Sequence, residues 1–219
     1  MTWFRRLFLI LVPLALIVFL IPHPAGGDDV FEGVSPDVDE WLFTHYGALL
    51  MFPLLGIAVY WLLDGLRGTA ATVSRVSLVF FLVFYTAYEV TVGAGTGVLV
   101  DYANGLPPEE QAAVADAIQE VNRNDVLGDP LSVTLVLGFF GWVVAMVAAG
   151  VAFRKAGASW PITILVGGAA LFAIHPPPVG PIGLLSFVAA VVLIERWRAR
   201  EKRAADAPPE PAAAVAPSA

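Results

Sequence analysis

The sequence contains no cysteine, so it forms no disulfide bond and offers neither a thiolate ligand nor a cysteine nucleophile. Charged residues make up only 14% of the 219 residues, whereas soluble domains carry about 25%. The motifs H-E-x-x-H, G-x-S-x-G and the phosphate-binding P-loop are also missing. These absences argue against a soluble protein and against the common motif-bearing enzymes.

Long apolar runs dominate what is present. The sequence is 58% hydrophobic and has a mean hydropathy of +0.77. About 20 helical residues span the roughly 30 Å hydrocarbon core of a bilayer. Six such segments follow one another, at about 4–22, 41–63, 75–100, 131–153, 157–175 and 178–196. We therefore predict an all-α fold, a polytopic membrane bundle of six transmembrane helices.

The basic residues predict the orientation of this bundle. With the N-terminus inside, only Arg123 of the 12 Lys and Arg residues falls in an outer loop. Both termini are therefore expected in the cytoplasm, with the chain in the plasma membrane. The abundance of Ala, Val, Gly, Pro and Arg is typical of a GC-rich prokaryotic genome.

Two features of the topology have alternatives. The first segment is either a retained helix or a cleaved signal peptide, and its long apolar run without an A-x-A site favours the retained helix. Segments 157–175 and 178–196 either cross fully or form a re-entrant hairpin, because basic residues flank the pair on the same side in both cases. Their uncharged length favours two full crossings.

The outer loops, 23–40 and 101–130, are acidic. Within the second loop, Pro107 and Pro108 suit a first helical turn, and Val114, Ile118 and Val121 share one face. A short amphipathic helix is predicted there. Residues 1–203 are expected to form the transmembrane domain, and the Ala/Pro-rich segment 204–219 a disordered cytoplasmic tail.

One acidic residue lies inside a predicted membrane helix. Glu89 sits in the outer half of segment 75–100, and such a residue usually faces the interior of a bundle. His45 and His175 fall near the same depth. Two imidazoles and a carboxylate can hold Zn²⁺ or non-haem Fe²⁺, so we predict a metal site of His45, Glu89 and His175. The side chains expected around this site are Tyr85, Tyr88 and Thr91. His23, in a proline-flanked loop, is interpreted as solvated.

Small residues predict close helix packing. Gly93 and Gly97 form a G-x-x-x-G motif, and Gly141, Ala145 and Ala149 form a stripe on the fourth segment. The glycines of 93–97 can also bend or unwind the helix beside Glu89.

The biochemical activity is not readable from these residues. The leading hypothesis is a polar, metal-binding or cation-binding site in the outer half of the bilayer, with a divalent ion such as Zn²⁺ as cofactor. The combination of His45, Glu89 and His175 on several helices is similar in kind to metal-dependent membrane hydrolases of the alkaline ceramidase and adiponectin-receptor type. Those proteins have seven helices and their own histidine spacing, and no family is assigned.

Two alternatives remain open. The chain is a non-catalytic membrane subunit or scaffold with acidic outer loops, or His45 and His175 ligate a b-type haem. The expected partners are the lipid bilayer and either another membrane protein or further copies of this chain. No feature indicates a nucleic-acid partner.

Overall fold

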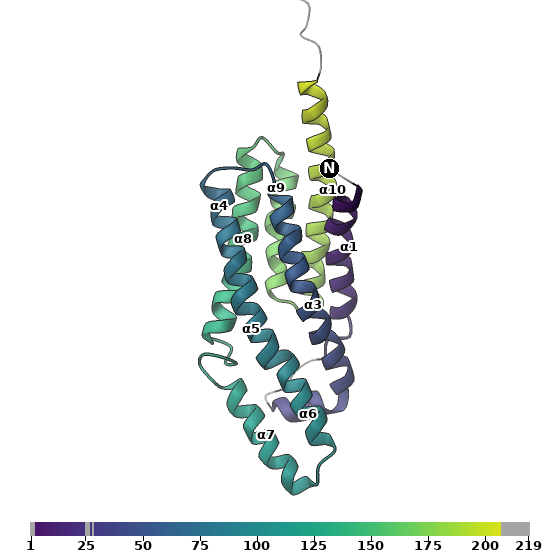
Figure 1. Ribbon diagram of the computed structural model, residues 1–219, viewed down its shortest axis with the longest axis vertical. Coiled ribbons are helices and arrows are strands. Elements are labelled where there is room, and N and C mark those ends of the chain that lie inside the picture. Colours follow the sequence, from purple (N-terminus) through teal and green to yellow (C-terminus); the bar gives the residue numbers. More distant parts are fainter. Residues whose placement is uncertain (1–2, 25–26, 28, 207–219) are drawn as a thin grey trace, which may run out of the picture.

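The computed structural model describes residues 3–24, 27 and 29–206. Within these residues the chain is all-helical and contains no strand. The helices lie roughly side by side in an elongated bundle (Figure 1). The predicted tail lies outside the described residues from position 207 onwards.

Five helices in the described part of the chain are long and apolar enough to cross a membrane. They are Trp3–Leu20, Val30–Leu62, Thr69–Asn104, Val133–Lys155 and Val179–Ala205. The all-helical fold and the presence of several membrane-crossing helices are therefore confirmed. These are the features of a multi-pass membrane protein, whereas the count of six crossings and the sidedness stay predictions.

Two of these five helices are built from more than one helical form. The first is α1 (Trp3–Leu20), and the second joins α2 (Val30–Val34), the 3₁₀ turn η1 (Ser35–Asp37) and α3 (Val38–Leu62). The third runs through α4 (Thr69–Phe80), η2 (Phe81–Tyr85), α5 (Thr86–Tyr88), η3 (Glu89–Gly95) and α6 (Thr96–Asn104), where η2 and η3 are π-helical. The remaining helices are α7 (Pro108–Asn122), α8 (Val133–Lys155), α9 (Trp160–Gly168) with the 3₁₀ segment η4 (Ala169–Ala173), and α10 (Val179–Ala205).

The fifth predicted segment is the one that differs most. It is helical only over Trp160–Ala173, nine residues of α9 followed by five of η4. At about 1.5 Å per α-helical and 2.0 Å per 3₁₀ residue, it rises roughly 23 Å, less than the hydrocarbon core. Its 3₁₀ end packs tightly on α10, because a Cβ on Gly183 would lie 2.9 Å from the Leu171 backbone. The last helix, by contrast, continues past its predicted end near 196 to Ala205.

The core of the bundle is aromatic and closely packed. Its largest fully buried side chains include Phe52, Phe81, Trp142, Phe172 and Phe187. The Trp142 indole donates to the carbonyl of Ala169 at 2.9 Å. This bond ties the segment Trp160–Ala173 to α8.

The predicted packing role of the small residues on α8 is confirmed. A Cβ on Gly141 would lie 2.6 Å from the Phe81 nitrogen, and one on Gly138 would lie 2.6 Å from the Tyr85 nitrogen. These glycines let the backbones of α8 and η2 come into direct contact. Ser74 also donates to the Ala145 carbonyl at 2.7 Å across the same interface.

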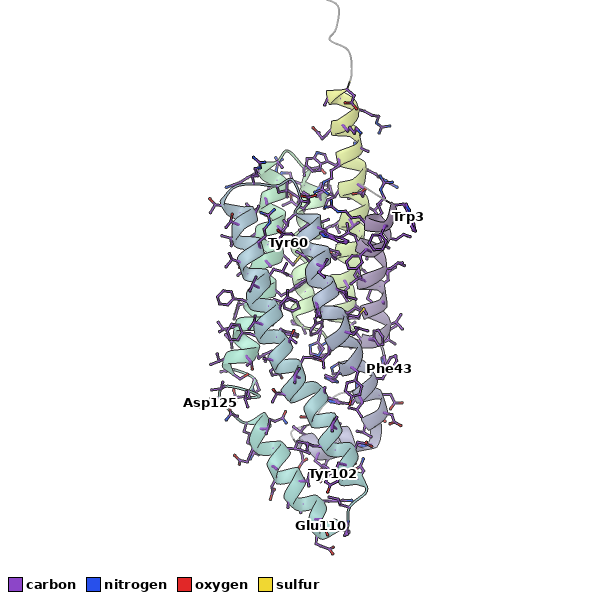
Figure 2. All side chains as sticks on the ribbon, viewed as in Figure 1. Trp3, Phe43, Tyr60, Tyr102, Glu110 and Asp125 are labelled. Atoms are coloured by element: carbon purple, nitrogen blue, oxygen red, sulfur yellow. The ribbon has the colours of Figure 1, made fainter. Side chains whose placement is uncertain are left out.

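The two ends of the bundle differ in chemistry. At the basic end, which carries the labelled Trp3 and Tyr60 in Figure 2, Arg5 pairs with Asp64 at 2.9 Å and Arg6 with Glu195 at 2.9 Å. The Arg5 guanidinium donates to Asp64 and carries a positive charge beside it, which lowers the pKa of that carboxyl.

At the opposite end, α2, α7 and the ends of α3 and α6 form a small cap (Figures 1 and 2). Its apolar cluster is separate from the main core and consists of Val34, Trp41, Val100 and Ile118, with Val30, Phe31, Val38 and Val114 packed around them. The helix α7 lies where a short outer-loop helix is predicted, and its Val114 and Ile118 belong to this cluster, whereas its place in an outer loop stays a prediction. The cap therefore covers the end of the bundle where the histidines lie.

Candidate metal site

Three histidines from separate parts of the chain meet beneath the cap. His23 follows α1, His45 lies in the first turns of α3, and His175 lies between η4 and α10. One ring nitrogen from each lies within 4.8 Å of the other two. The ring centroid of His23 lies 5.1 Å from the ring centroid of His45 and 5.0 Å from that of His175. All three histidines of the sequence are thus gathered at one point.

His45 is held with one nitrogen turned toward its neighbours. Its Nδ1–H donates to the Trp41 carbonyl one turn earlier at 2.7 Å, and its ring stacks on the Trp41 indole. Nε2 therefore carries the lone pair, following the usual rule that one ring nitrogen fixes the tautomer of the other. Room for this ring comes from Gly93, where a Cβ would overlap the His45 Cδ2 atom.

His23 is oriented in the same way. Its Nδ1–H donates to the Pro24 carbonyl at 2.7 Å, and its Nε2 lies 3.1 Å from the Nε2 of His175. Burial lowers the pKa of His23 below its ordinary value near 6.5. A neutral imidazole at neutral pH is the form that a metal requires.

His175 is positioned by the buried Tyr85. The Tyr85 hydroxyl lies 2.7 Å from His175 Nδ1 and 3.1 Å from the Ala173 carbonyl. When the hydroxyl donates to Ala173, His175 Nδ1–H donates to the Tyr85 oxygen. In this arrangement of protons, all three Nε2 atoms carry lone pairs and all three Nδ1–H groups have acceptors. Histidines that ligate metals commonly have such a partner on the other nitrogen.

Glu89 lies at the edge of this cluster. It begins the π-helical segment η3, and its side chain is 1% exposed. Its Oε1 atom is 3.8 Å from His45 Nε2 and has no hydrogen-bond partner among the residues that the structure describes. A buried carboxyl oxygen without a partner is costly, so this atom is placed to accept a contact from a further group.

The surroundings of the predicted site are partly as expected. The structure brings His45, His175 and Tyr85 together and puts Glu89 beside them, although their role as ligands stays a prediction. The ring of Tyr88 lies 6.3 Å from that of Tyr85. The Thr91 hydroxyl instead donates to the Ala87 carbonyl of its own helix at 2.9 Å.

His23 is the residue that the sequence did not assign to the site. It is half-buried and in contact with both other histidines, rather than solvated as its proline-flanked position indicated. The one signal in the sequence was that all three histidines fall at the same end of the predicted bundle. That signal says nothing about how the chain turns after α1.

The described residues are all-helical, include five helices long and apolar enough to cross a membrane, and bring three histidines together. These features define the class, a multi-pass membrane protein whose three histidines can form a site. The particular family is not shown. Comparison with protein-family models, with curated proteins and with solved structures finds no match.

Proposed function

We propose that this chain is a multi-pass membrane protein that binds one divalent metal ion of the zinc class through His23, His45 and His175. The observation that carries the proposal is the convergence of three imidazole nitrogens within 4.8 Å. Three histidines with an open fourth position are a known zinc arrangement, and imidazole also suits copper, iron and nickel.

The geometry fits such an ion after small movements of the rings. Zinc–nitrogen bonds of 2.0–2.1 Å in a tetrahedral site place the nitrogens about 3.3 Å apart. His23 and His175 are already 3.1 Å apart at Nε2, whereas the His45 ring centroid lies 6.4 Å from that of His175. The fourth coordination position of the ion would be filled by Glu89 or by a water molecule bound to its unpaired Oε1. A metal there would supply Lewis acidity or a fixed link between helices.

For the topology, we propose six crossings with both ends in the cytoplasm and residues 1–203 as the membrane domain. His175 supports the sixth crossing, because it touches His23 just beyond the far end of α1. The segment Trp160–Ala173 thus reaches the depth that α1 reaches. With the basic end in the cytoplasm of a plasma membrane, the histidines and the cap lie at the outer face.

The haem alternative is less favoured than a single ion. A haem between His45 and His175 needs open space between the two rings for the porphyrin. The His23 ring lies about 5 Å from both of them and fills that region. The scaffold alternative, with a membrane-protein partner or further copies of this chain, makes no use of the converging nitrogens.

The metal content of the purified protein tests the proposal. We expect about one equivalent of zinc per wild-type chain after dialysis against the metal. His23→Gln, His45→Gln and His175→Gln should each weaken zinc binding more than tenfold, because each removes one ligand. Elemental analysis and competition with a chelating dye measure both quantities.

Two further variants sharpen this experiment. Thr91→Ala is the matched control, since its hydroxyl serves only the helix that carries Glu89, and it should bind zinc as wild type does. Glu89→Gln keeps all three histidines and should bind zinc more weakly than wild type, by about 10–100-fold. Wild-type zinc well below one equivalent and unchanged in all three histidine variants would rule out the site and favour the scaffold.

A further inference from the structure

A groove at the basic end is unrelated to the histidines. It runs along the outside of the bundle between α3 and α4 and has a volume of about 490 Å³. Its apolar length is lined mainly by Gly56, Ile57, Val76, Val79 and Leu82. Ile57, Val76 and Val79 are 43–57% exposed, so the bundle itself leaves this surface uncovered.

The groove opens at its end into a polar cavity of about 600 Å³. Tyr60, Trp61 and Arg75 line both spaces, and the cavity adds Arg5 and Asp64. Two guanidinium groups therefore face one carboxylate there. The polar end carries a net positive charge directly beside an apolar channel.

Both arginines are held in place by the fold. Arg75 donates to the carbonyls of Leu63 and Leu66 at 3.0 and 3.1 Å, and its guanidinium lies over the Tyr60 ring at 5.8 Å. Arg5 bonds to Asp64 and to the Trp61 carbonyl through its terminal nitrogens. Its Nε–H is buried and has no acceptor within the described part of the chain. Both guanidinium groups are thus fixed at the polar end.

The apolar groove and the polar cavity together fit one class of ligand, a molecule with an anionic head and an apolar chain. The eight residues from Arg75 to Leu82 extend about 10 Å along the helix, enough for the upper part of one acyl chain. A phosphate at the head of that chain would meet the guanidinium groups of Arg75 and Arg5, which both line the polar cavity. Basic pockets between helices at a membrane surface commonly bind anionic headgroups.

We propose that this groove binds one anionic phospholipid from the leaflet at the basic end, with its phosphate at Arg5 and Arg75 and one acyl chain along Val76, Val79 and Leu82. This inference is independent of the metal site. A free phosphate would use only the polar cavity, and a zwitterionic lipid would gain less from the two arginines.

Native mass spectrometry of the full chain in detergent tests this binding. We compare retention of phosphatidylglycerol and phosphatidylcholine of the same chain length. Wild type should retain one phosphatidylglycerol at least fivefold better than phosphatidylcholine. Arg75→Gln should reduce this preference about fivefold, since one cation near a headgroup has roughly that effect. Val79→Trp, which fills the apolar groove, should weaken retention of both lipids.

Three controls make the result decisive. Arg154→Gln removes a cation of α8 that lies over the Trp160 ring of α9, and it should leave the preference unchanged. Arg75→Lys keeps the charge and should keep most of the preference, which separates loss of charge from loss of the Leu63 and Leu66 contacts. Inorganic phosphate should not displace the bound lipid. Equal retention of both lipids by wild type, equal effects of Arg75→Gln and Arg154→Gln, or displacement by phosphate would each overturn the proposal.

Discussion

Replacing Gly93 with alanine is expected to weaken zinc binding more than tenfold at neutral pH without removing any ligand. The added Cβ would overlap His45 Cδ2 and lie 3.0 Å from Glu89 Oε1. The His45 ring is stacked on Trp41 and cannot move away freely. It must turn its Nε2 away from His23, so zinc affinity should fall more than tenfold, with a destabilisation of about 1–3 kcal/mol from overpacking.

The matched control is Gly167→Ala on α9. An added Cβ at Gly167 meets no atom within 4 Å, so this variant should bind zinc normally and be slightly stabilised. Zinc affinity is measured by dye competition, and folding by near-ultraviolet circular dichroism. Wild-type affinity in Gly93→Ala, with the fold intact, would show that His45 does not bind the metal in the position described.

Zinc is expected to stabilise the folded chain strongly. An ion that binds only the folded state stabilises it by about 4 kcal/mol when present at a thousandfold excess over its dissociation constant. For a chain of about 200 residues this corresponds to a rise of roughly 10 °C in the melting temperature. The physical reason is that the ion links three segments that the sequence separates widely. Thermal unfolding in detergent, with zinc and then with a chelator, measures the shift.

His45→Gln provides the reference for this effect. With one ligand removed, the melting temperature should be nearly the same with zinc and with chelator. Thr91→Ala should keep the full shift. An equal shift in wild type and His45→Gln would mean that zinc acts elsewhere on the protein.

The helices were predictable because the length of each apolar run can be counted in the sequence. The runs around Pro53 and Trp142 are long and nearly free of charge, and the structure has helices there. The segment that ends at Ala173 could not be delimited in this way. Its last five residues are apolar enough for a membrane helix, but contact with Gly183 and the prolines after His175 leave them as a 3₁₀ turn.

The candidate site was predictable only in part, for a related reason. Glu89 stood out because a carboxylate in an apolar run is rare, and His45 lay at a matching depth. His23 lies beyond the end of α1, where no periodic pattern predicts the path of the chain. The glycines of 93–97 indicated an irregular helix beside Glu89, but they did not predict the π-helical segments η2 and η3. Each of these segments inserts a residue that shifts the phase of every later side chain by about 100°.

The three histidines also impose an order on the maturation of the chain. His23 and His175 are separated by 152 positions, yet their Nε2 atoms are 3.1 Å apart. While the chain is being synthesised from its N-terminus, His23 and His45 are made long before the turn that carries His175. The complete set of nitrogens exists only after the last helical pair has been inserted and docked. Metal loading would therefore be a late event, possible only for chains whose transmembrane bundle is fully assembled.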